Sequence, residues 1–348
     1  MRGPARMSAR IVGCGIYLPR LRIKCDEYRK NWGFFAPRWL EEKTVADFDE
    51  DSITMAVEAA SNALRNADLD ASQIDALYFA STSPPYAEKL NASTVATALN
   101  CRSDIATEDI ASSIKCGISA LLSGFDYVKS GRGRLCIIVA ADAPIADPTG
   151  SLDQQMGAAA ASVIIGSEQV GALMEGSSSI TRDSLGERFR RDGRRYVQTV
   201  DLGRYQEASA EEIVTSCVTD LMKKLERTGG DYDFFALHGF EDWRTIDLAR
   251  KLGFEDGKVT PAMFSAKVGD AGAASPVLAL SKVLESAMLK QHIILCSYGP
   301  GAGADALSLV VEAEMKTNPG LRFEDYLARK EYVDYPTYLK LRAFLGGN

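Results

Sequence analysis

Short apolar segments rich in β-branched residues alternate with helical segments along this chain, and the alternation runs twice. In the first run, the patterns predict strands over residues 10–19, 74–82, 134–142 and 161–168 and helices over 51–67, 93–100 and 116–131. In the second run, they predict strands over 171–180, 233–240, 292–299 and 306–315 and helices over 208–229, 245–253 and 273–291. Each run ends in a pair of strands, which indicates an internally duplicated α/β protein.

The two runs meet near residues 168–172, and this boundary divides the chain into three parts. We expect an N-terminal half over residues 1–170, a C-terminal half over 171–316 and an appended arm over 317–348. The arm is charged and aromatic, which is typical of a helical segment and not of a flexible linker.

Charge and hydropathy exclude several classes of protein. The 348 residues include 40 Lys and Arg against 47 Asp and Glu, a formal net charge of −7 without a basic block, which argues against a duplex nucleic-acid binder. No apolar run approaches the roughly 18 residues of a membrane span. The basic opening residues are not followed by an apolar stretch, as they would be in a secretory signal.

Cysteine and histidine usage bears on metal and redox chemistry. The seven cysteines stand singly, and His238 and His292 are the only histidines. This pattern predicts neither a metal site nor a disulfide framework. Scattered thiols fit a reducing compartment, so we expect the protein in the cytoplasm.

Six stretches, spread over nearly the whole chain, form a specific combination: VGCGIYLPRLRI (12–23), DEDSITMAVEAASNAL (49–64), SPPYAEK (83–89), the helix after Cys116, SYGPGAGADALSL (297–309) and FEDYLARKEYVDYPTYLKLR (323–342). Together they resemble the thiolase superfamily and, within it, the hydroxymethylglutaryl-CoA (HMG-CoA) synthases of archaea and some bacteria. The resemblance implies a thiolase-like, duplicated five-layer α/β/α/β/α sandwich and a dimer across the sheet of the first half. It also implies Claisen-type carbon–carbon chemistry on acyl-CoA, with a CoA thioester as substrate or ligand and no tightly bound cofactor.

In this family a cysteine at a helix N-terminus takes the acyl group, because the helix dipole and local amides stabilise its thiolate. The family pattern puts this cysteine five residues after a strand Asp, here Asp109, and three before a helix start that here is Gly117. Both anchors place Ile114 at the nucleophile position, and an isoleucine cannot hold an acyl group. Cys116 is therefore either a displaced nucleophile or a small buried core thiol.

The family's general base is a Glu, and Thr82 stands at its position. A threonine hydroxyl cannot accept a proton at neutral pH as a carboxylate does. Glu88 follows six residues later, and it is either a substitute base or one more solvated glutamate.

The resemblance also implies a strand-end histidine that polarises the second acyl-CoA's carbonyl, and in related ketoacyl synthases an Asn joins it. His238 matches this histidine, and its alternative is a satisfied core histidine. Asp270 stands at the Asn position, where an ionised carboxylate would repel the developing oxyanion. Its alternative is a turn aspartate between Gly269 and Gly272.

The loop over residues 297–306 keeps the family's glycines, and the resemblance makes Tyr298, Gly299 and Gly301 substrate-binding candidates. Pro300 stands where the family usually has Ser, and a proline has no N–H to donate.

Three functions stay open. The first is a non-catalytic HMG-CoA-synthase-like subunit of an acyl-CoA-handling assembly, either a homodimer or a hetero-oligomer with a thiolase and a zinc-ribbon/OB-fold protein. The second is an active acyl-CoA C-acyltransferase that uses Cys116 and His238. The third is a hydrolase or decarboxylase that uses His238 and Asp270 with water.

Two aromatic groups each have two interpretations. The arm's tyrosines form either a docking surface for a partner or a contact with the chain's own body: Tyr332, Tyr335 and Tyr338. The early aromatic residues either cap the acyl pocket or form a surface cluster: Trp32, Phe34, Phe35 and Trp39.

Overall fold

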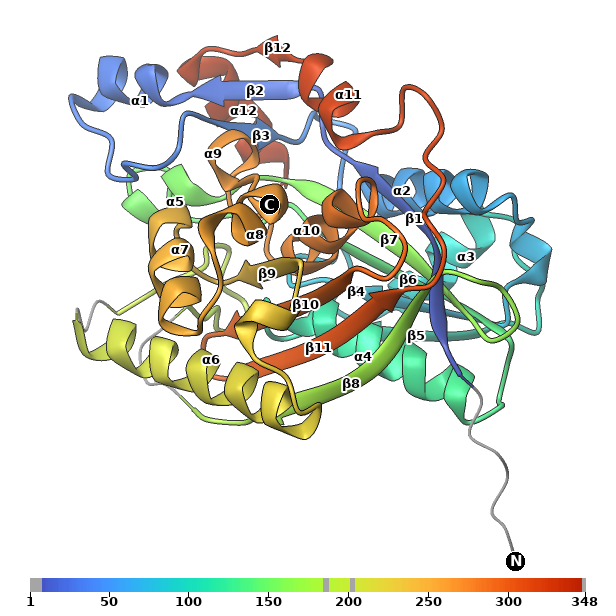
Figure 1. Ribbon diagram of the computed structural model, residues 1–348. Coiled ribbons are helices and arrows are strands. Elements are labelled where there is room, and N and C mark those ends of the chain that lie inside the picture. Colours follow the sequence, from blue (N-terminus) through green and yellow to red (C-terminus); the bar gives the residue numbers. More distant parts are fainter. Residues whose placement is uncertain (1–7, 184–187, 201–203, 346–348) are drawn as a thin grey trace, which may run out of the picture.

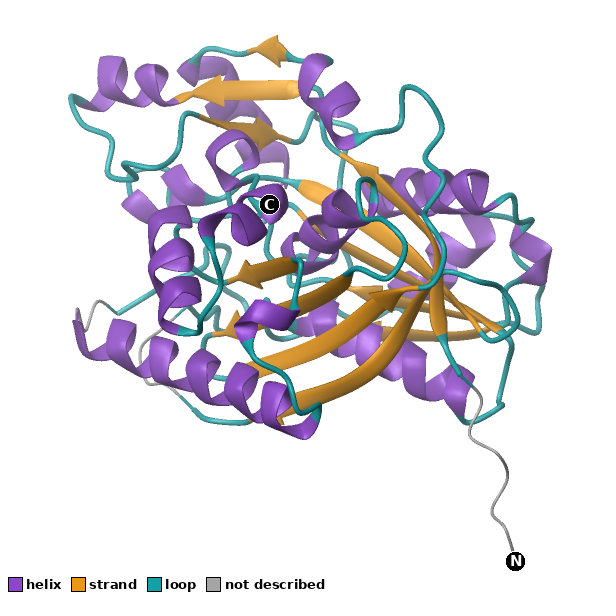
Figure 2. Ribbon diagram, in the orientation of Figure 1, coloured by secondary structure: helices purple, strands orange, loops and turns teal. Residues whose placement is uncertain are grey.

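The computed structural model describes residues 8–183, 188–200 and 204–345, and nine strands in this part of the chain form one mixed sheet (Figure 1). Its first half has the order β5-β4-β6-β7-β1: Ala106–Ile110, Ala76–Ala80, Leu135–Asp142, Ala159–Gly166 and Arg10–Tyr17. Its second half has the order β8-β11-β10-β9: Ala172–Ile180, Gly303–Val311, His292–Gly299 and Phe234–His238. The halves are joined by two residue pairs between β1 and β8, beyond which they diverge (Figure 2).

Helices cover both half-sheets and fill the space between them. The outer layer on the first half contains α2 (Ser52–Ala67) and α3 (Asn91–Ala98). The middle layer contains α4 (Cys116–Lys129) and α10 (Ala274–Leu284), which contact strands of both halves. The outer layer on the second half contains α6 (Arg204–Lys224), with α7 (Asp242–Lys251) and α8 (Asp256–Val259) beside it. The five-layer order that the resemblance implied is confirmed.

Local chemistry explains why these segments form as predicted. The whole of β6 is buried, as its continuous apolar sequence predicted. Asp51 caps α2 by accepting hydrogen bonds from the backbone N–H groups of Ile53 and Thr54. Helix α2 lies so close to β1 that a Cβ at Gly15 would be 2.2 Å from the backbone nitrogen of Ala63, so only glycine fits there.

A second, smaller sheet was not predicted, and it joins the early residues to the arm. Its order is β12-β2-β3: Glu331–Tyr332, Leu21–Lys24 and Glu42–Val45. Around it lie α1 (Cys25–Trp32), α9 (Ser265–Val268), α11 (Phe323–Ala328) and α12 (Tyr335–Leu345) (Figure 1). The sequence showed no clear alternation here because these strands are only two to four residues long.

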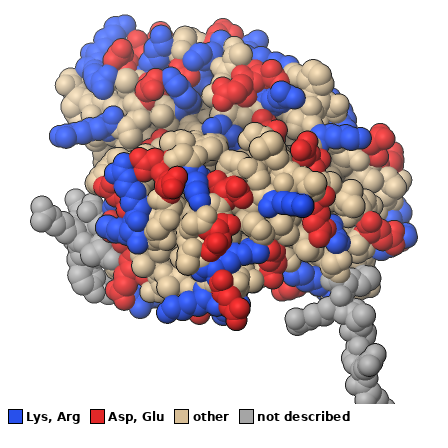
Figure 3. Space-filling view, viewed as in Figure 1, with Lys and Arg blue, Asp and Glu red and all other residues tan. Residues whose placement is uncertain are grey.

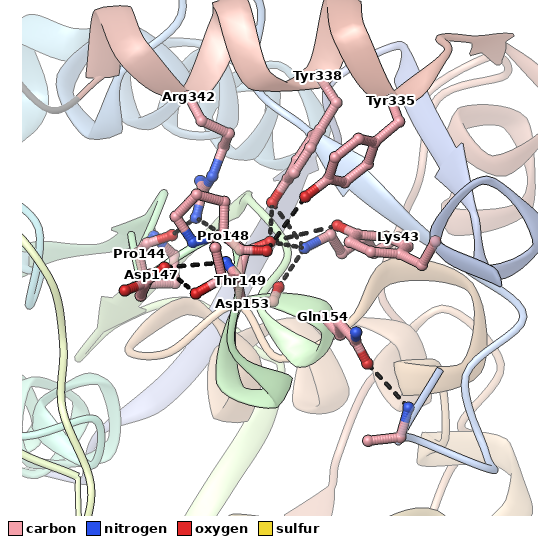
Figure 4. A network of polar contacts seen from close by, with 12 residues as sticks. Lys43, Pro144, Asp147, Pro148, Thr149, Asp153, Gln154, Tyr335, Tyr338 and Arg342 are labelled. Carbon is pink, nitrogen blue, oxygen red and sulfur yellow. Dashed lines mark hydrogen bonds and ion pairs between the residues drawn. The ribbon is translucent and has the colours of Figure 1, made fainter. Parts of the chain in front are cut away.

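A buried polar network ties α12 to the short helix α5 (Ser151–Gln155), as Figure 4 shows. The fully buried carboxylate of Asp153 accepts hydrogen bonds from the Tyr338 hydroxyl at 2.6 Å and from Arg342 at 3.2 Å. The Lys43 ammonium lies 3.6 Å from the same carboxylate and donates to the Tyr338 hydroxyl at 3.0 Å. Two basic groups and one carboxylate are thus held out of water under the arm.

The network decides between the two interpretations of the arm. Tyr335 and Tyr338 are 4% and 1% exposed and pack against Tyr28, so the prediction of a docking surface is wrong for these two. Tyr332 is 44% exposed and remains accessible. The arm's aromatic residues serve mainly to fix it to its own body.

Surface charge is mixed on the face of Figure 3, where acidic and basic side chains are interspersed. No helix in the described part of the chain combines the length and the apolar character needed to cross a membrane.

Raising the pH from 7 to 9 is expected to stabilise the native chain by about 2 kcal/mol relative to a Lys43→Met variant. Burial lowers the pKa of Lys43 to about 7, against the attraction of Asp153, whereas an unfolded lysine stays protonated at pH 9. The unfolded chain therefore binds more protons over this interval, and the folded state gains stability as the pH rises. Urea unfolding of both proteins at the two pH values measures the effect, and a parallel pH dependence would contradict it.

Candidate active site

Two cavities of about 290 Å³ each are lined in part by Ile114, which lies two residues before α4 in the middle layer. The first is lined largely by apolar side chains, among them Trp39, Phe240, Met263 and Phe264. The second is lined by residues of two loops, 81–84 after β4 and 111–114 after β5, and by residues 188–190. Three residues line both cavities and mark their junction: Ile114, Arg188 and Pro300.

Ile114 and Cys116 face different surroundings. Ile114 lines both cavities, whereas Cys116 lines neither and is 2% exposed in the central core. Burial, with the nearby charge of Asp142, raises the pKa of the Cys116 thiol well above its usual value. The thiol is therefore neither accessible nor activated, although it occupies the first turn of α4.

His238 ends β9 and lies beside Asp270. Its Nε2 is 3.4 Å from Asp270 Oδ1, and its Nδ1 is 3.1 Å from the Ser297 hydroxyl oxygen. Since a carboxylate only accepts, Nε2 carries the proton that points at Asp270, and Nδ1 then accepts from Ser297. In this arrangement His238 directs its proton at a neighbouring carboxylate.

Asp270 is also held by Arg188, whose Nη1 lies 2.5 Å from Oδ2. Burial would raise the pKa of Asp270, but the charge of Arg188 and the hydrogen bond from His238 outweigh it and hold this pKa well below the usual range. The same carboxylate accepts a hydrogen bond from the backbone N–H of Gly272 at 2.8 Å, as an aspartate in a turn does. Asp270 is thus an ionised carboxylate with its charge offset by an arginine.

Thr82 is held by a buried carboxylate at the end of β6. Its hydroxyl donates to Asp142 Oδ2 and its backbone N–H to Oδ1, both at 2.8 Å. Asp142 also accepts from the Ser81 hydroxyl, from both N–H and hydroxyl of Ser83, and from the Ala273 N–H. Glu88 is exposed and lines neither cavity.

The loop after β10 contributes Pro300, while its neighbours face elsewhere. Tyr298 is buried and packs against Phe240 at 5.7 Å between ring centroids. Gly299 lets the 113–115 segment approach closely, since a Cβ there would be 2.3 Å from the Ser113 hydroxyl oxygen. Gly301 adopts a left-handed backbone with φ of 69°. None of these three lines either cavity.

Comparison with known proteins places the chain in a family. It is 34% identical over 336 residues to the HMG-CoA synthase of Pyrococcus horikoshii, covering 95% of each chain. It is also 34% identical over 341 residues to that of Methanopyrus kandleri, covering 95% of this chain and 96% of the other. The chain belongs to the HMG-CoA synthase family. A scan against family models found no match.

Comparison with solved structures shows the fold. MvaS in complex with 3-hydroxy-3-methylglutaryl coenzyme A superposes with a TM-score of 0.82 at 19% identity, covering 97% of this chain and 92% of the other. The 3-oxoacyl-[acyl-carrier-protein] synthase III of Aquifex aeolicus superposes with a TM-score of 0.75 at 22% identity, covering 87% and 99%. The predicted thiolase-like fold is confirmed.

Sequence reasoning missed two residues that organise this family member's site. Asp142 is the last residue of the eight-residue buried strand β6. A charged residue at the end of such an apolar strand was the signal that could have pointed to it. Arg188 stands in an arginine-rich stretch with no strand or helix pattern, so nothing in the sequence pointed to its partner Asp270, 82 residues later.

Among the early aromatic residues, Trp39 lines the first cavity, whereas Phe35 packs on Tyr28.

Cys116 is expected to resist iodoacetamide in the folded chain, while Cys25 reacts. Cys116 is buried with a raised thiol pKa, and Cys25 is partly exposed. Peptide mass mapping after brief labelling at about pH 8 measures both sites in one sample. Labelling of Cys116 at the rate of Cys25 would show that its thiol reaches solvent.

Asp142→Asn is expected to lower the free energy of unfolding by at least about 3 kcal/mol. The amide would turn an N–H₂ group towards donors that now bind a carboxylate oxygen. Because two donors cannot bond to each other, buried hydrogen bonds would be lost. Urea unfolding measures the loss. Asp147→Asn is the matched control, because Asp147 is exposed and bonds only within its own loop, to Thr149.

Proposed function

We propose that this chain is a non-catalytic member of the HMG-CoA synthase family that binds an acyl-CoA and acts as a subunit of a thiolase or acyltransferase assembly. Family membership supports acyl-CoA chemistry of the Claisen type. Relatives of the same fold have been solved with HMG-CoA and with CoA, which supports a CoA thioester as the ligand.

One observation carries the proposal: Ile114 is one of the three residues that line both cavities, and the nearby thiol of Cys116 lines neither and is buried in the core. An acyl group moving between the cavities would meet a hydrocarbon, to which it cannot be transferred. The other replaced positions support the same conclusion. The Thr82 hydroxyl donates a hydrogen bond to Asp142, and the Nε2 proton of His238 points at Asp270.

The alternative is an active acyl-CoA C-acyltransferase that uses Cys116 and His238. It requires residues 112–117 to rearrange so that the Cys116 thiol turns from the core to the cavities. Nothing in the geometry favours that rearrangement, because Lys115 is held by an ion pair of 2.6 Å to Asp305 on β11. The active acyltransferase therefore remains the alternative that incubation with acetyl-CoA can reveal.

Incubation with acetyl-CoA is expected to leave the native chain unmodified and to acetylate an Ile114→Cys variant. The variant places a thiol where both cavities meet, so a bound thioester can transfer its acyl group to it. Intact-mass measurement reads the adduct, and the same substitution in a Cys116→Ala background assigns it to position 114.

Two results would contradict the proposal. An acetyl adduct on the native chain that disappears in Cys116→Ala would make Cys116 the nucleophile and the chain an active acyltransferase. Absence of an adduct on Ile114→Cys would show that position 114 does not meet the thioester. The proposed assembly is tested separately, by asking whether a thiolase co-purifies with the tagged chain from its own cells.

A further inference from the structure

The buried network under the arm holds two basic side chains against a single carboxylate (Figure 4). Lys43 is 1% exposed, Arg342 is 8% exposed and Asp153 is fully buried. The Lys43 ammonium lies 3.6 Å from the Asp153 carboxylate, and Arg342 Nη2 lies 3.2 Å from it. When Lys43 is protonated, the network therefore carries an excess positive charge, which is costly to keep out of water.

Lys43 meets this network on one face of the small sheet. The charged or titratable side chains that face it come from α5, α12 and α1: Asp153, Tyr338, Arg342 and Tyr28. On β2, Ile23 stands opposite Lys43. The neighbours of Ile23 on that strand, Arg22 and Lys24, therefore lie on the other face. On α9, Lys267 forms an ion pair with an exposed carboxylate instead.

Loss of a proton from Lys43 removes the excess charge. Burial lowers the pKa of Lys43 to about 7, against the attraction of Asp153 and together with the repulsion of Arg342. Tyr338 covers the ammonium, which lies 4.8 Å from the centre of its ring, so detachment of α12 exposes Lys43 to water. An exposed lysine has a pKa of about 10.4. Detachment therefore takes up a proton above about pH 7, and α12 is held more tightly as the pH rises.

Helix α5 connects this network to the first cavity. The Lys43 ammonium donates to the backbone carbonyl of Asp153, whose side chain is bound by α12. Leu152 and Gln155, on the same short helix, line the first cavity. The carbonyl of Gln155 accepts from the N–H of Asp270 at 2.8 Å. One wall of the cavity is thus attached to the helix that Lys43 and α12 hold in place.

We propose that α12 is a proton-controlled latch on the wall of the first cavity: gain of a proton by Lys43 releases α12, and α5 loosens with it. In the latched state Lys43 is neutral, and Asp153 and Arg342 pair with each other without an excess charge. The latch goes beyond the proposed function and does not depend on it, because helix opening is a property of the chain without any ligand.

The test is amide hydrogen exchange of the full-length chain at about pH 7 and pH 9, read by peptide mass spectrometry and corrected for the intrinsic exchange rate at each pH. We expect the opening of α12 and of α5 to become at least about tenfold rarer at the higher pH. Both helices should exchange faster than the buried strand β6, as local opening requires. Lys43→Met, which has no proton to gain, should remove the pH dependence from both helices.

Lys340→Met is the matched control, because Lys340 is an exposed lysine on α12 itself, and it should keep the native pH dependence. Opening of α12 that does not change with pH in the native chain would overturn the latch. The native pH dependence persisting in Lys43→Met would overturn it too. A change in α12 without one in α5 would overturn the link to the cavity. Each of these results leaves the acetylation of Ile114→Cys, and with it the proposed function, to be decided separately.

Discussion

The N-terminal ends of α4 and α10 meet in the middle layer so closely that a Cβ at Gly117 would lie 2.1 Å from the carbonyl oxygen of Ala273. This contact brings the 111–116 segment of one half against the 269–273 segment of the other. Asp142 reinforces it by accepting from the Ala273 N–H and from the loop that carries Thr82. Ile114 and Asp270, which belong to these two segments, are thereby brought to the lining of the first cavity.

The charges at the site are mutually compensated. The buried carboxylate of Asp270 would be unfavourable alone, and Arg188 binds it at 2.5 Å. His238 likewise has an internal partner in Asp270. Such pairing is expected of buried charged groups, because uncompensated ones would destabilise the fold.

The arm contributes to the same site from a distance. Asp153, which Tyr338 and Arg342 hold under α12, lies on a short helix whose neighbouring residues Leu152 and Gln155 line the first cavity. The backbone carbonyl of Gln155 accepts from the N–H of Asp270 at 2.8 Å. The C-terminal segment therefore supports the wall of a cavity built by residues far from it in the chain.

The sequence by itself determined the duplicated layers and the order of the long strands and helices, but not β5 or the small sheet, and it led to the prediction that Ile114 and Thr82 stand at the family's nucleophile and base positions. Period-2 and period-3.6 patterns are local, and the motifs around these positions are contiguous, so both can be recognised along the chain. Only the tertiary structure decided that Cys116 faces the core, that Arg188 neutralises Asp270, and that the arm covers the early residues. These facts depend on side chains that lie 82 to 295 residues apart in sequence and meet only after the layers have packed.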